Sequence, residues 1–172
     1  VATKMLIGAG ITEIHLLDLA CGKGGDLFKW NKNNISNVVG IDISSNNIYD
    51  PKDGACIRYT EFTKKTESYN IISPLKKVDF LYGDVSLNIR TGEAMKSEHS
   101  RQLGEELWQT YGTRGFDMIS IQFALHYLFE SENKLDGFLK NISENLRAGG
   151  IFIGTCFDGN KVYKLLKDVD VG

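Results

Sequence analysis

Several residue types that define common protein classes are scarce in this sequence. Two of its 172 residues are proline and three are cysteine, at Cys21, Cys56 and Cys156. The cysteines form no C-x-x-C pair and have no zinc-ligand spacing, so we expect reduced, intracellular thiols and no metal centre. No apolar run reaches the roughly 18 residues of a membrane-spanning helix, and no signal peptide is visible.

Basic residues are not in excess either. The 20 Lys and Arg residues face 22 Asp and Glu residues, which gives a formal net charge of -2. This balance argues against a protein that coats long nucleic acid by charge alone, but it leaves open the recognition of one short nucleic-acid end.

The overall composition is typical of a globular domain with a core. With 42% hydrophobic and 24% charged residues, we expect residues 1–172 to form a single domain. The chain starts at Val1 without a methionine and stops at Gly172 just after a helix-like stretch. We therefore expect a fragment that is truncated at both ends.

Strand patterns alternate with helix patterns along the chain. Apolar runs predict strands at residues 14–19, 38–43, 78–82, 116–123 and 151–157. Helices are expected at residues 25–30, at 132–147 with Gly149-Gly150 as the stop, and around Val162, Leu165 and Leu166. A further helix should begin with Ser44 as its N-cap, break at Pro51 and Gly54, and resume at residues 57–59. Residues 86–112 are polar, and we expect there an insertion-like excursion with one or two helical turns near 103–108.

This alternation predicts an α/β fold with a mostly parallel, Rossmann-like sheet and helices on both faces. Ligands of such sheets bind outside the carboxyl ends of the strands. A polar residue stands at each predicted strand end, namely Asp18, Asp42, Asp84, Gln122 and Asp158. These positions are the first candidates for a site.

The glycine turn after the first strand favours a ligand with an adenosine group. Gly22, Gly24 and Gly25 let a ligand approach the backbone. Asp42 follows about 20 residues later at the end of the second strand, where an acid can accept both hydroxyls of a ribose. The alternative is an ordinary strand-to-helix turn with a capping Asp.

The acids near this turn favour S-adenosylmethionine over a dinucleotide. A dinucleotide site needs G-x-G-x-x-G, whereas this turn lacks the third glycine and has Asp26 where a pyrophosphate would be repelled. Acids suit a ligand with ammonium and sulfonium groups. Asp18 can hold the ammonium group, Asp42 the ribose and Asp84 the adenine amino group.

Four segments together resemble the mRNA cap guanine-N7 methyltransferases. They are D-L-A-C-G-K-G-G-D-L at 18–27, V-G-I-D-I-S at 39–44, Q-F-A-L-H-Y-L-F-E at 122–130 and G-G-I-F-I-G-T-C-F-D-G-N at 149–160. The resemblance runs from about residue 16 to 166, is weakest between 60 and 115, and is closest to the methyltransferase domain of large-DNA-virus capping enzymes. It implies a class I S-adenosylmethionine-dependent methyltransferase fold.

The resemblance also implies roles for individual residues. Its cofactor-binding positions fall on Asp18, Ala20, Gly22, Asp42, Ile43, Asp84, Val85, Gln122 and Tyr127. Its substrate positions fall on Lys23, which would face the capped RNA end, on Lys29 and Arg58 at the cap phosphates, and on Phe123, His126 and Phe157 around the guanine. The family often has glycine where this chain has Ala20, and cellular members often have proline where it has Phe157.

The implied reaction is methyl transfer from S-adenosylmethionine to N7 of a GpppN cap, leaving S-adenosylhomocysteine. N7 has a free lone pair and no proton, so we assign no catalytic acid, base or nucleophile, and positioning carries the rate. The partner is then the 5′ end of a capped RNA. Guanylyltransferase or triphosphatase domains in a longer chain are a further expectation, as is a host-cytoplasmic or virion location if viral and a nuclear one if cellular.

Three other interpretations remain open at this point. One is a class I methyltransferase with a different acceptor, such as a small molecule, although Q-F-A-L-H-Y disfavours it. Another is a non-catalytic module that binds caps or other proteins, against which the acids and the glycine turn count. The last is a nicotinamide oxidoreductase, opposed by the missing glycine and the acidic turn.

Overall fold

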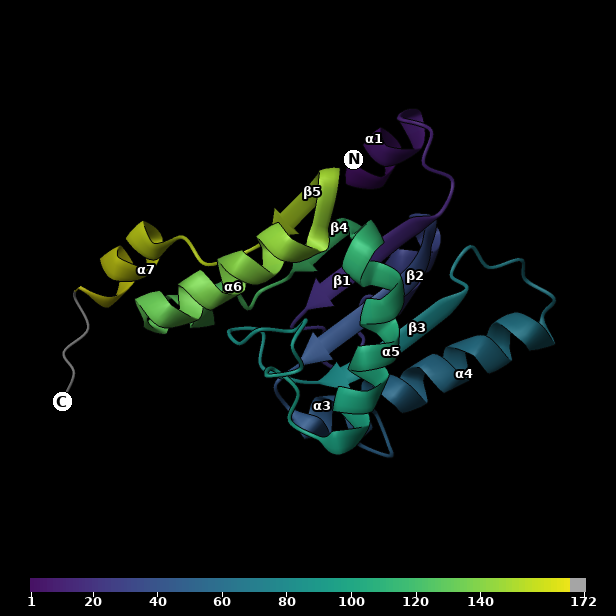
Figure 1. The fold of residues 1–172 in the computed structure, drawn as a ribbon, viewed down its shortest axis with the longest axis horizontal. Coiled ribbons are helices and arrows are strands. Elements are labelled where there is room, and N and C mark those ends of the chain that lie inside the picture. Colours follow the sequence, from purple (N-terminus) through teal and green to yellow (C-terminus); the bar gives the residue numbers. More distant parts are fainter. Residues whose placement is uncertain (168–172) are drawn as a thin grey trace.

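A single parallel sheet organises the chain. The computed structural model describes residues 1–167 (Figure 1). Its five strands lie in the order β3-β2-β1-β4-β5, and every neighbouring pair is parallel. The strands are β1 (Ile14–Leu19), β2 (Ile35–Asp42), β3 (Lys77–Tyr82), β4 (Phe116–Ile121) and β5 (Leu146–Gly154).

Helices cover both faces of this sheet because its strands are apolar on both sides. On β1, Leu17 and Leu19 belong to one hydrophobic cluster, whereas Ile14 and Leu16 belong to another. The first cluster takes in α5 (Glu98–Arg114) and α6 (Glu132–Asn145), and the second takes in α1 (Ala2–Gly8), α2 (Leu27–Lys32) and α4 (Ala55–Ser68). The expected parallel α/β arrangement is confirmed.

The remaining elements are short. They are α3 (Ser45–Tyr49), the 3₁₀ helix η1 (Leu125–Glu130) and α7 (Gly159–Leu166). Ser44 caps α3 as expected, since its side chain accepts a hydrogen bond from the backbone N–H of Asn47. The predicted interruption at Pro51 and Gly54 separates α3 from α4. Val162, Leu165 and Leu166 lie on α7, which has no buried residue and extends away from the sheet in Figure 1.

The excursion predicted for residues 86–112 is wrong in its helical content. In place of one or two turns, α5 is a helix of 17 residues. Leu107, Trp108 and Tyr111 bury one side of it against the sheet, and Trp108 Nε1 donates a hydrogen bond of 3.0 Å to Asn145 Oδ1. Tertiary contacts of this kind stabilise a helix whose own sequence is polar and contains glycine.

Gly149 and Gly150 do not end a helix. The helix α6 ends earlier, at Asn145, and both glycines lie in β5. Leu146 pairs with Phe116 and Ile151 pairs with Met118, so the segment between them bulges out of the ladder. Gly149 has φ +74°, a left-handed backbone angle that glycine adopts at little cost in such a bulge. The predicted strand ends also differ, since β4 stops at Ile121 and β5 at Gly154.

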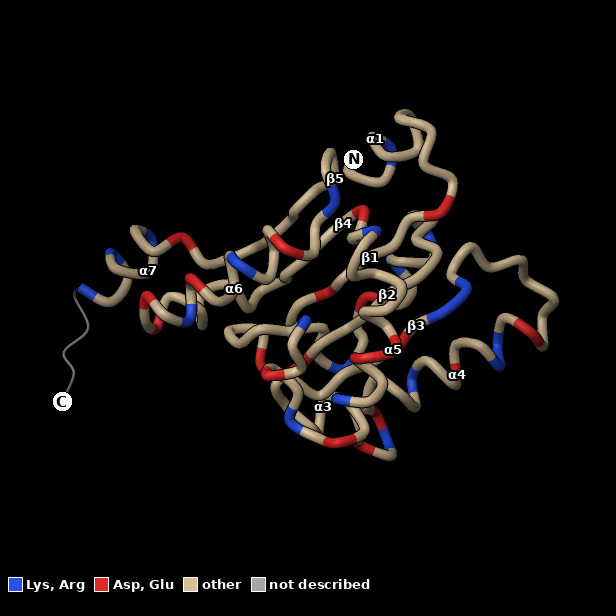
Figure 2. Tube along the Cα trace, viewed as in Figure 1, with Lys and Arg blue, Asp and Glu red and all other residues tan. Residues whose placement is uncertain are grey.

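Charged residues are dispersed over the molecule. Figure 2 shows basic and acidic positions interspersed over the elements rather than gathered on one of them. Within residues 1–167 no helix is both long and apolar enough to cross a membrane.

Candidate functional site

Two adjoining pockets lie at the carboxyl ends of the strands. The first, here the β2–β3 pocket, measures about 340 Å³ and is lined by Ala20, Asp42, Ile43, Gly83, Asp84, Val85, Ser86, Ile121, Ala124, Tyr127, Leu128, Glu130 and Lys134. The second, here the glycine-turn pocket, measures about 470 Å³ and is lined by Asp18, Ala20, Cys21, Gly22, Lys23, Gly25, Asp26, Lys29, Arg58, Gln122 and Phe123. Ala20 belongs to both, so the two pockets meet at the residue that follows β1.

Asp42 ties the ends of β1 and β2 together. Its Oδ2 accepts a hydrogen bond of 2.8 Å from the backbone N–H of Gly22. Its Oδ1 accepts hydrogen bonds from the Ser44 backbone at 2.9 Å and from Asn47 Nδ2 at 3.0 Å. A carboxylate offers about four acceptor sites. The chain therefore leaves Asp42 room for one ligand hydroxyl, and a second would have to displace a donor such as Asn47.

The glycine turn contains left-handed backbone angles that residues with a side chain rarely adopt. Ala20 has φ +70°, and Gly22 and Gly24 have φ +56° and +67°. Left-handed conformation costs a residue with a Cβ about 1–2 kcal/mol. Ala20 is therefore a strained position between the two pockets, where a glycine would be relaxed.

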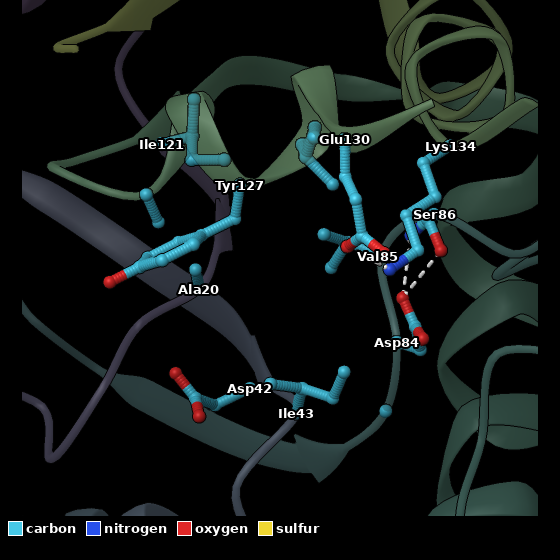
Figure 3. A pocket seen from close by; sticks show the side chains of 13 residues that line it. Ala20, Asp42, Ile43, Asp84, Val85, Ser86, Ile121, Tyr127, Glu130 and Lys134 are labelled. Atoms are coloured by element: carbon cyan, nitrogen blue, oxygen red, sulfur yellow. Dashed lines mark hydrogen bonds and ion pairs between the residues drawn. The ribbon is translucent and has the colours of Figure 1, made fainter. Parts of the chain in front are cut away.

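Asp84 and the loop after it form the far end of the β2–β3 pocket. Figure 3 shows Asp42 and Tyr127 at one end of this pocket, and Asp84 with Ser86 and Lys134 at the other. Asp84 Oδ1 accepts hydrogen bonds from the Ser86 backbone at 3.0 Å and from its hydroxyl at 2.7 Å. Ile43 and Val85 supply apolar walls between the two acids.

The helix α6 fixes the loop that carries Val85. The buried side chain of Asn141 donates hydrogen bonds to the carbonyl oxygens of Val85 at 2.9 Å and Leu87 at 2.7 Å. It also accepts one from the Ile89 backbone at 3.1 Å. One turn earlier, a Cβ on Gly137 would stand 2.0 Å from the Ser86 carbonyl oxygen. Helix and loop are thus packed without space between them.

Asp18 places a buried acid on the floor of the glycine-turn pocket. It is 4% exposed, and the Ser120 hydroxyl donates a hydrogen bond to its carboxylate. Burial raises the pKa of Asp18 from 3.8 to about 7, and the negative charges of Asp26 and Asp42 add to this effect. Burial likewise raises the pKa of the neighbouring Cys21 thiol, which makes it unreactive.

Three cations line the glycine-turn pocket together with this acid. Lys23 pairs with Asp53 at 2.6 Å and Lys29 pairs with Asp26 at 2.6 Å. The hydrogen bond to Asp26 raises the pKa of Lys29. Arg58 Nη1 donates a hydrogen bond of 3.3 Å to the Lys23 carbonyl oxygen. These ion pairs are exposed and therefore weak, so an anionic ligand can replace the carboxylates.

Gln122 and Phe123 follow β4 at the mouth of the same pocket. The Phe123 backbone N–H donates to the Thr155 hydroxyl at 2.8 Å, and that hydroxyl donates to Gln122 Oε1 at 3.3 Å. This contact joins the ends of β4 and β5. Phe123 has φ +56° and a side chain that is 72% exposed. An exposed aromatic ring on a strained backbone is typical of a binding site.

His126 lies between two aromatic rings outside both pockets. Its ring centroid is 4.2 Å from that of Tyr127 and 4.7 Å from that of Phe157. Its Nδ1 is buried, and no residue of the described part, 1–167, forms a hydrogen bond to it. Buried polar atoms of this kind are usually paired, so this nitrogen is an exception in the ring cluster.

The structure thus brings the sequence-predicted site residues to one edge of the sheet. Asp42, Ile43, Asp84, Val85 and Tyr127 line the β2–β3 pocket, and Asp18, Gly22, Lys23, Lys29, Arg58, Gln122 and Phe123 line the glycine-turn pocket. Ala20 lines both pockets, whereas His126 and Phe157 line neither and pack against each other with tilted rings.

Sequence reasoning missed part of the β2–β3 pocket. Ser86, Glu130 and Lys134 line it, and Lys134 pairs with Glu130 at 2.6 Å. The Ser86 contact has a sequence signal, because an Asp two residues before a Ser is typical of a side-chain-capped turn. No pattern indicated that the first turn of α6 faces the pocket. Within residues 1–167 no group of three or more His, Cys, Asp or Glu side chains could hold a metal ion.

Residues 6–172 match the sequence profile of the mRNA (guanine-N(7))-methyltransferase domain. The chain is 36% identical over 155 residues to mRNA cap guanine-N(7) methyltransferase 1 of Oryza sativa, and 31% identical over 159 residues to the Schizosaccharomyces pombe mRNA cap guanine-N(7) methyltransferase. These matches cover 90% and 92% of this chain, and the chain spans 36% of each relative. A mimivirus protein named "Probable mRNA-capping enzyme" is 33% identical over 156 residues, which is 88% of this chain and 13% of that protein.

Solved structures agree on the fold. A Pyrococcus horikoshii protein matches 98% of this chain with a TM-score of 0.56, over 61% of its own length. An S-adenosylmethionine-dependent methyltransferase of Clostridium acetobutylicum matches 96% with a TM-score of 0.54, over 53% of its own length. Both are 20% identical to this chain, so they bear on its architecture alone.

Proposed function

The chain belongs to the mRNA (guanine-N(7))-methyltransferase family, and we propose that it transfers a methyl group from S-adenosylmethionine to N7 of an mRNA cap guanine. It spans about a third of its first relatives, so the activity is proposed for the protein that contains it. The observation that carries the proposal is the meeting of an acid-lined and a cation-lined pocket at Ala20.

The acids suit the cofactor. Asp18 and Gly22 would hold its methionine end, Asp42 its ribose, and Asp84 with Val85 its adenine. A cation beside Asp18 would satisfy a carboxylate that burial leaves without a positive partner, which supports an ammonium group there. The volume of about 340 Å³ for the β2–β3 pocket is in the range of small-ligand sites.

The cations suit a capped RNA end. A cap carries a triphosphate, and Lys23, Lys29 and Arg58 can form charge-assisted hydrogen bonds to it once their present partners give way. The rings of Phe123 and Phe157 offer stacking faces for guanine. His126 packs against Phe157 with ring centroids 4.7 Å apart and so supports one of these faces.

Positioning is the main contribution of these residues to the reaction. The cofactor supplies a methyl group on a positively charged sulfur, an electrophile that guanine N7 can attack without losing a proton. Asp42 and Asp84 would hold the donor from the β2–β3 pocket, and Asp18 would hold its methionine end in the glycine-turn pocket. The cations and Phe123 of the glycine-turn pocket would hold the acceptor. Ala20 lines both pockets, so a small side chain lies at their junction. Such alignment replaces general acid or base catalysis.

Calorimetric titration with S-adenosylmethionine, S-adenosylhomocysteine and NAD tests the cofactor assignment. We expect the first two to bind and NAD to give no heat, because Asp18 and Asp26 repel a pyrophosphate at the glycine turn. Binding of NAD alone would indicate an oxidoreductase. Absence of all binding would contradict the assignment of these acids.

Partner and location follow from the same proposal. We propose the GpppN end of RNA as the macromolecular partner and an intracellular place of action. The relatives include plant, fungal and viral proteins, so viral origin and fused capping domains stay predictions.

A further inference from the structure

A third pocket lies beside the cation-lined one, between α2 and α4. This α2–α4 pocket measures about 190 Å³ and is lined by Gly24, Leu27, Phe28, Arg58, Glu61, Phe62 and Lys65. We propose that it binds the first transcribed nucleotide of the capped RNA, with its base on Phe28 and its phosphate between Arg58 and Lys65. The inference rests on the proposed function and extends it past the cap.

Phe28 is exposed in a helix whose other apolar residues are buried. Its side chain is 68% exposed, whereas Leu27 and Trp30 are 3% and 4% exposed. The ring meets the buried Phe62 edge-on, with centroids 5.4 Å apart and an interplanar angle of 79°. This contact holds the Phe28 ring on one side, and its exposure leaves much of the ring accessible to a ligand. Single-stranded RNA is commonly recognised by bases stacked on such rings.

The two cations of this pocket, Arg58 and Lys65, lie on one face of α4. Arg58, Phe62 and Lys65 stand at i, i+4 and i+7 on α4, so they share one face of that helix. Arg58 also lines the glycine-turn pocket, where we place the cap triphosphate. From Arg58 to Lys65 the helix axis rises about 10.5 Å. A chain that leaves the triphosphate along α4 therefore passes Phe28 before it reaches Lys65.

Glu61 adds a negatively charged side chain to this pocket. Its carboxylate lines the pocket together with the two cations. It disfavours a second phosphate at that point, but it can accept a hydrogen bond from an exocyclic amino group of a base. A site with a ring face, flanking cations and one acceptor fits a nucleotide better than an acidic peptide. Continuity with the cap site through Arg58 selects the nucleotide joined to the cap.

The test compares acceptors of increasing length on the full chain with S-adenosylhomocysteine bound. Equilibrium affinity is measured for GTP, for GpppA and for a GpppA-capped trinucleotide. Phe28→Ala should weaken GpppA about tenfold and leave GTP unchanged, since stacking is worth about 1–3 kcal/mol per base. Tyr69→Ala is the matched control, because Tyr69 is an exposed ring at the end of α4 that lines none of these pockets.

Lys65 is tested with its neighbour as control. Lys65→Ala should weaken the capped trinucleotide and make its binding less sensitive to salt, whereas Lys64→Ala, which removes the same charge one residue earlier, should change neither.

The outcomes separate the inference from the function on which it rests. If the parent binds the three acceptors but Phe28→Ala matches Tyr69→Ala for GpppA, the nucleotide site is wrong and the cap site stands. Equal losses for GTP and GpppA in Phe28→Ala would also overturn the inference, because they would place Phe28 in the cap site. If the parent binds none of the acceptors, both proposals fail.

Discussion

The backbone N–H of Gly22 donates a hydrogen bond of 2.8 Å to Oδ2 of Asp42, so the last residue of β2 fixes the glycine turn that follows β1. The same carboxylate holds Ser44 and Asn47 at the start of α3. Asp42 therefore joins the glycine turn to the wall of the β2–β3 pocket. The contact explains why an acid at this position matters before any ligand binds.

Replacing Asp42 with Ala should weaken S-adenosylmethionine binding by about ten- to hundred-fold, the equivalent of about 1.5–3 kcal/mol for a lost charged hydrogen bond. Calorimetry measures this, and Asp136→Ala, which removes an exposed acid of α6, is the control. Equal affinities of Asp42→Ala and the parent would show that Asp42 has no part in the ribose site.

Cofactor affinity should depend on the ionisation of Asp18. Burial raises the pKa of Asp18 to about 7, and a positively charged group binds the ionised carboxylate only. The dissociation constant should therefore increase about tenfold from pH 8 to pH 6. Asp18→Asn should bind weakly with no such step in this interval. A step of the same size in Asp18→Asn would assign the titration to another group.

The stability of the free protein should show the opposite consequence of the same pKa. Because the pKa of Asp18 is higher in the folded than in the unfolded chain, its contribution to stability is fully present below pH 3.8 and is lost as the pH rises to about 7. At pH 8 Asp18→Asn should therefore unfold at a higher temperature than the parent. A lower midpoint at pH 8 would contradict the raised pKa.

Ala20→Gly should stabilise the fold. Ala20 has φ +70°, and relief of this strain exceeds the entropy that glycine adds to the unfolded chain by about 0.5–1 kcal/mol. Urea unfolding measures the difference. The control is Ala148→Gly, an exposed alanine without positive φ, which should gain nothing. Destabilisation by Ala20→Gly would mean that the methyl group packs usefully at the junction of the pockets.

His126→Ala should lower the rate of methyl transfer to a cap about ten- to hundred-fold and change S-adenosylmethionine affinity little. The reason is that the His126 ring packs against Phe157, a proposed stacking face for guanine, so its loss should misplace the acceptor but not the donor. Steady-state kinetics and calorimetry separate the two effects. His99→Ala, at an exposed position of α5, is the control and should leave both unchanged.

Asp117→Ala should destabilise the protein by about 3 kcal/mol without affecting cofactor affinity below the unfolding transition. Asp117 is fully buried at the start of β4, away from the pockets, and accepts hydrogen bonds from Arg147 Nε at 2.6 Å, His15 N at 2.8 Å and Arg114 Nη2 at 3.0 Å. Burial would raise its pKa, but these donors hold the pKa below its ordinary value. Parent-like stability in thermal unfolding would contradict this assignment.

The existence and order of the strands could be predicted because their signals are local, although the predicted ends of β4 and β5 lie beyond the observed ones. Residues 14–19 are apolar except for His15 and Asp18 and end before the glycine turn, and β1 has these same bounds. Parallel strands put their carboxyl ends at one edge, so Asp18, Asp42 and Asp84 could be assigned to one site from the chain order alone.

The features that the sequence did not predict depend on contacts between residues far apart in the chain. The 17 residues of α5 are helical because Leu107 and Trp108 pack on the sheet and because the Trp108 indole N–H donates a hydrogen bond to Asn145. The polar sequence of this stretch does not indicate these contacts. Lys134 belongs to the pocket only because Gly137 and Asn141 seat α6 directly on the loop after β3. Such packing cannot be derived from one element taken alone.

The most direct test of the account is the position of the transferred methyl group. The full chain is incubated with S-adenosylmethionine labelled in its methyl group and with unmethylated GpppA-capped RNA, which is then digested to nucleosides. The account predicts that the label appears in 7-methylguanosine and that His126→Ala reduces it. Label on another nucleoside, or no label while S-adenosylmethionine binds, would contradict guanine-N7 methyl transfer.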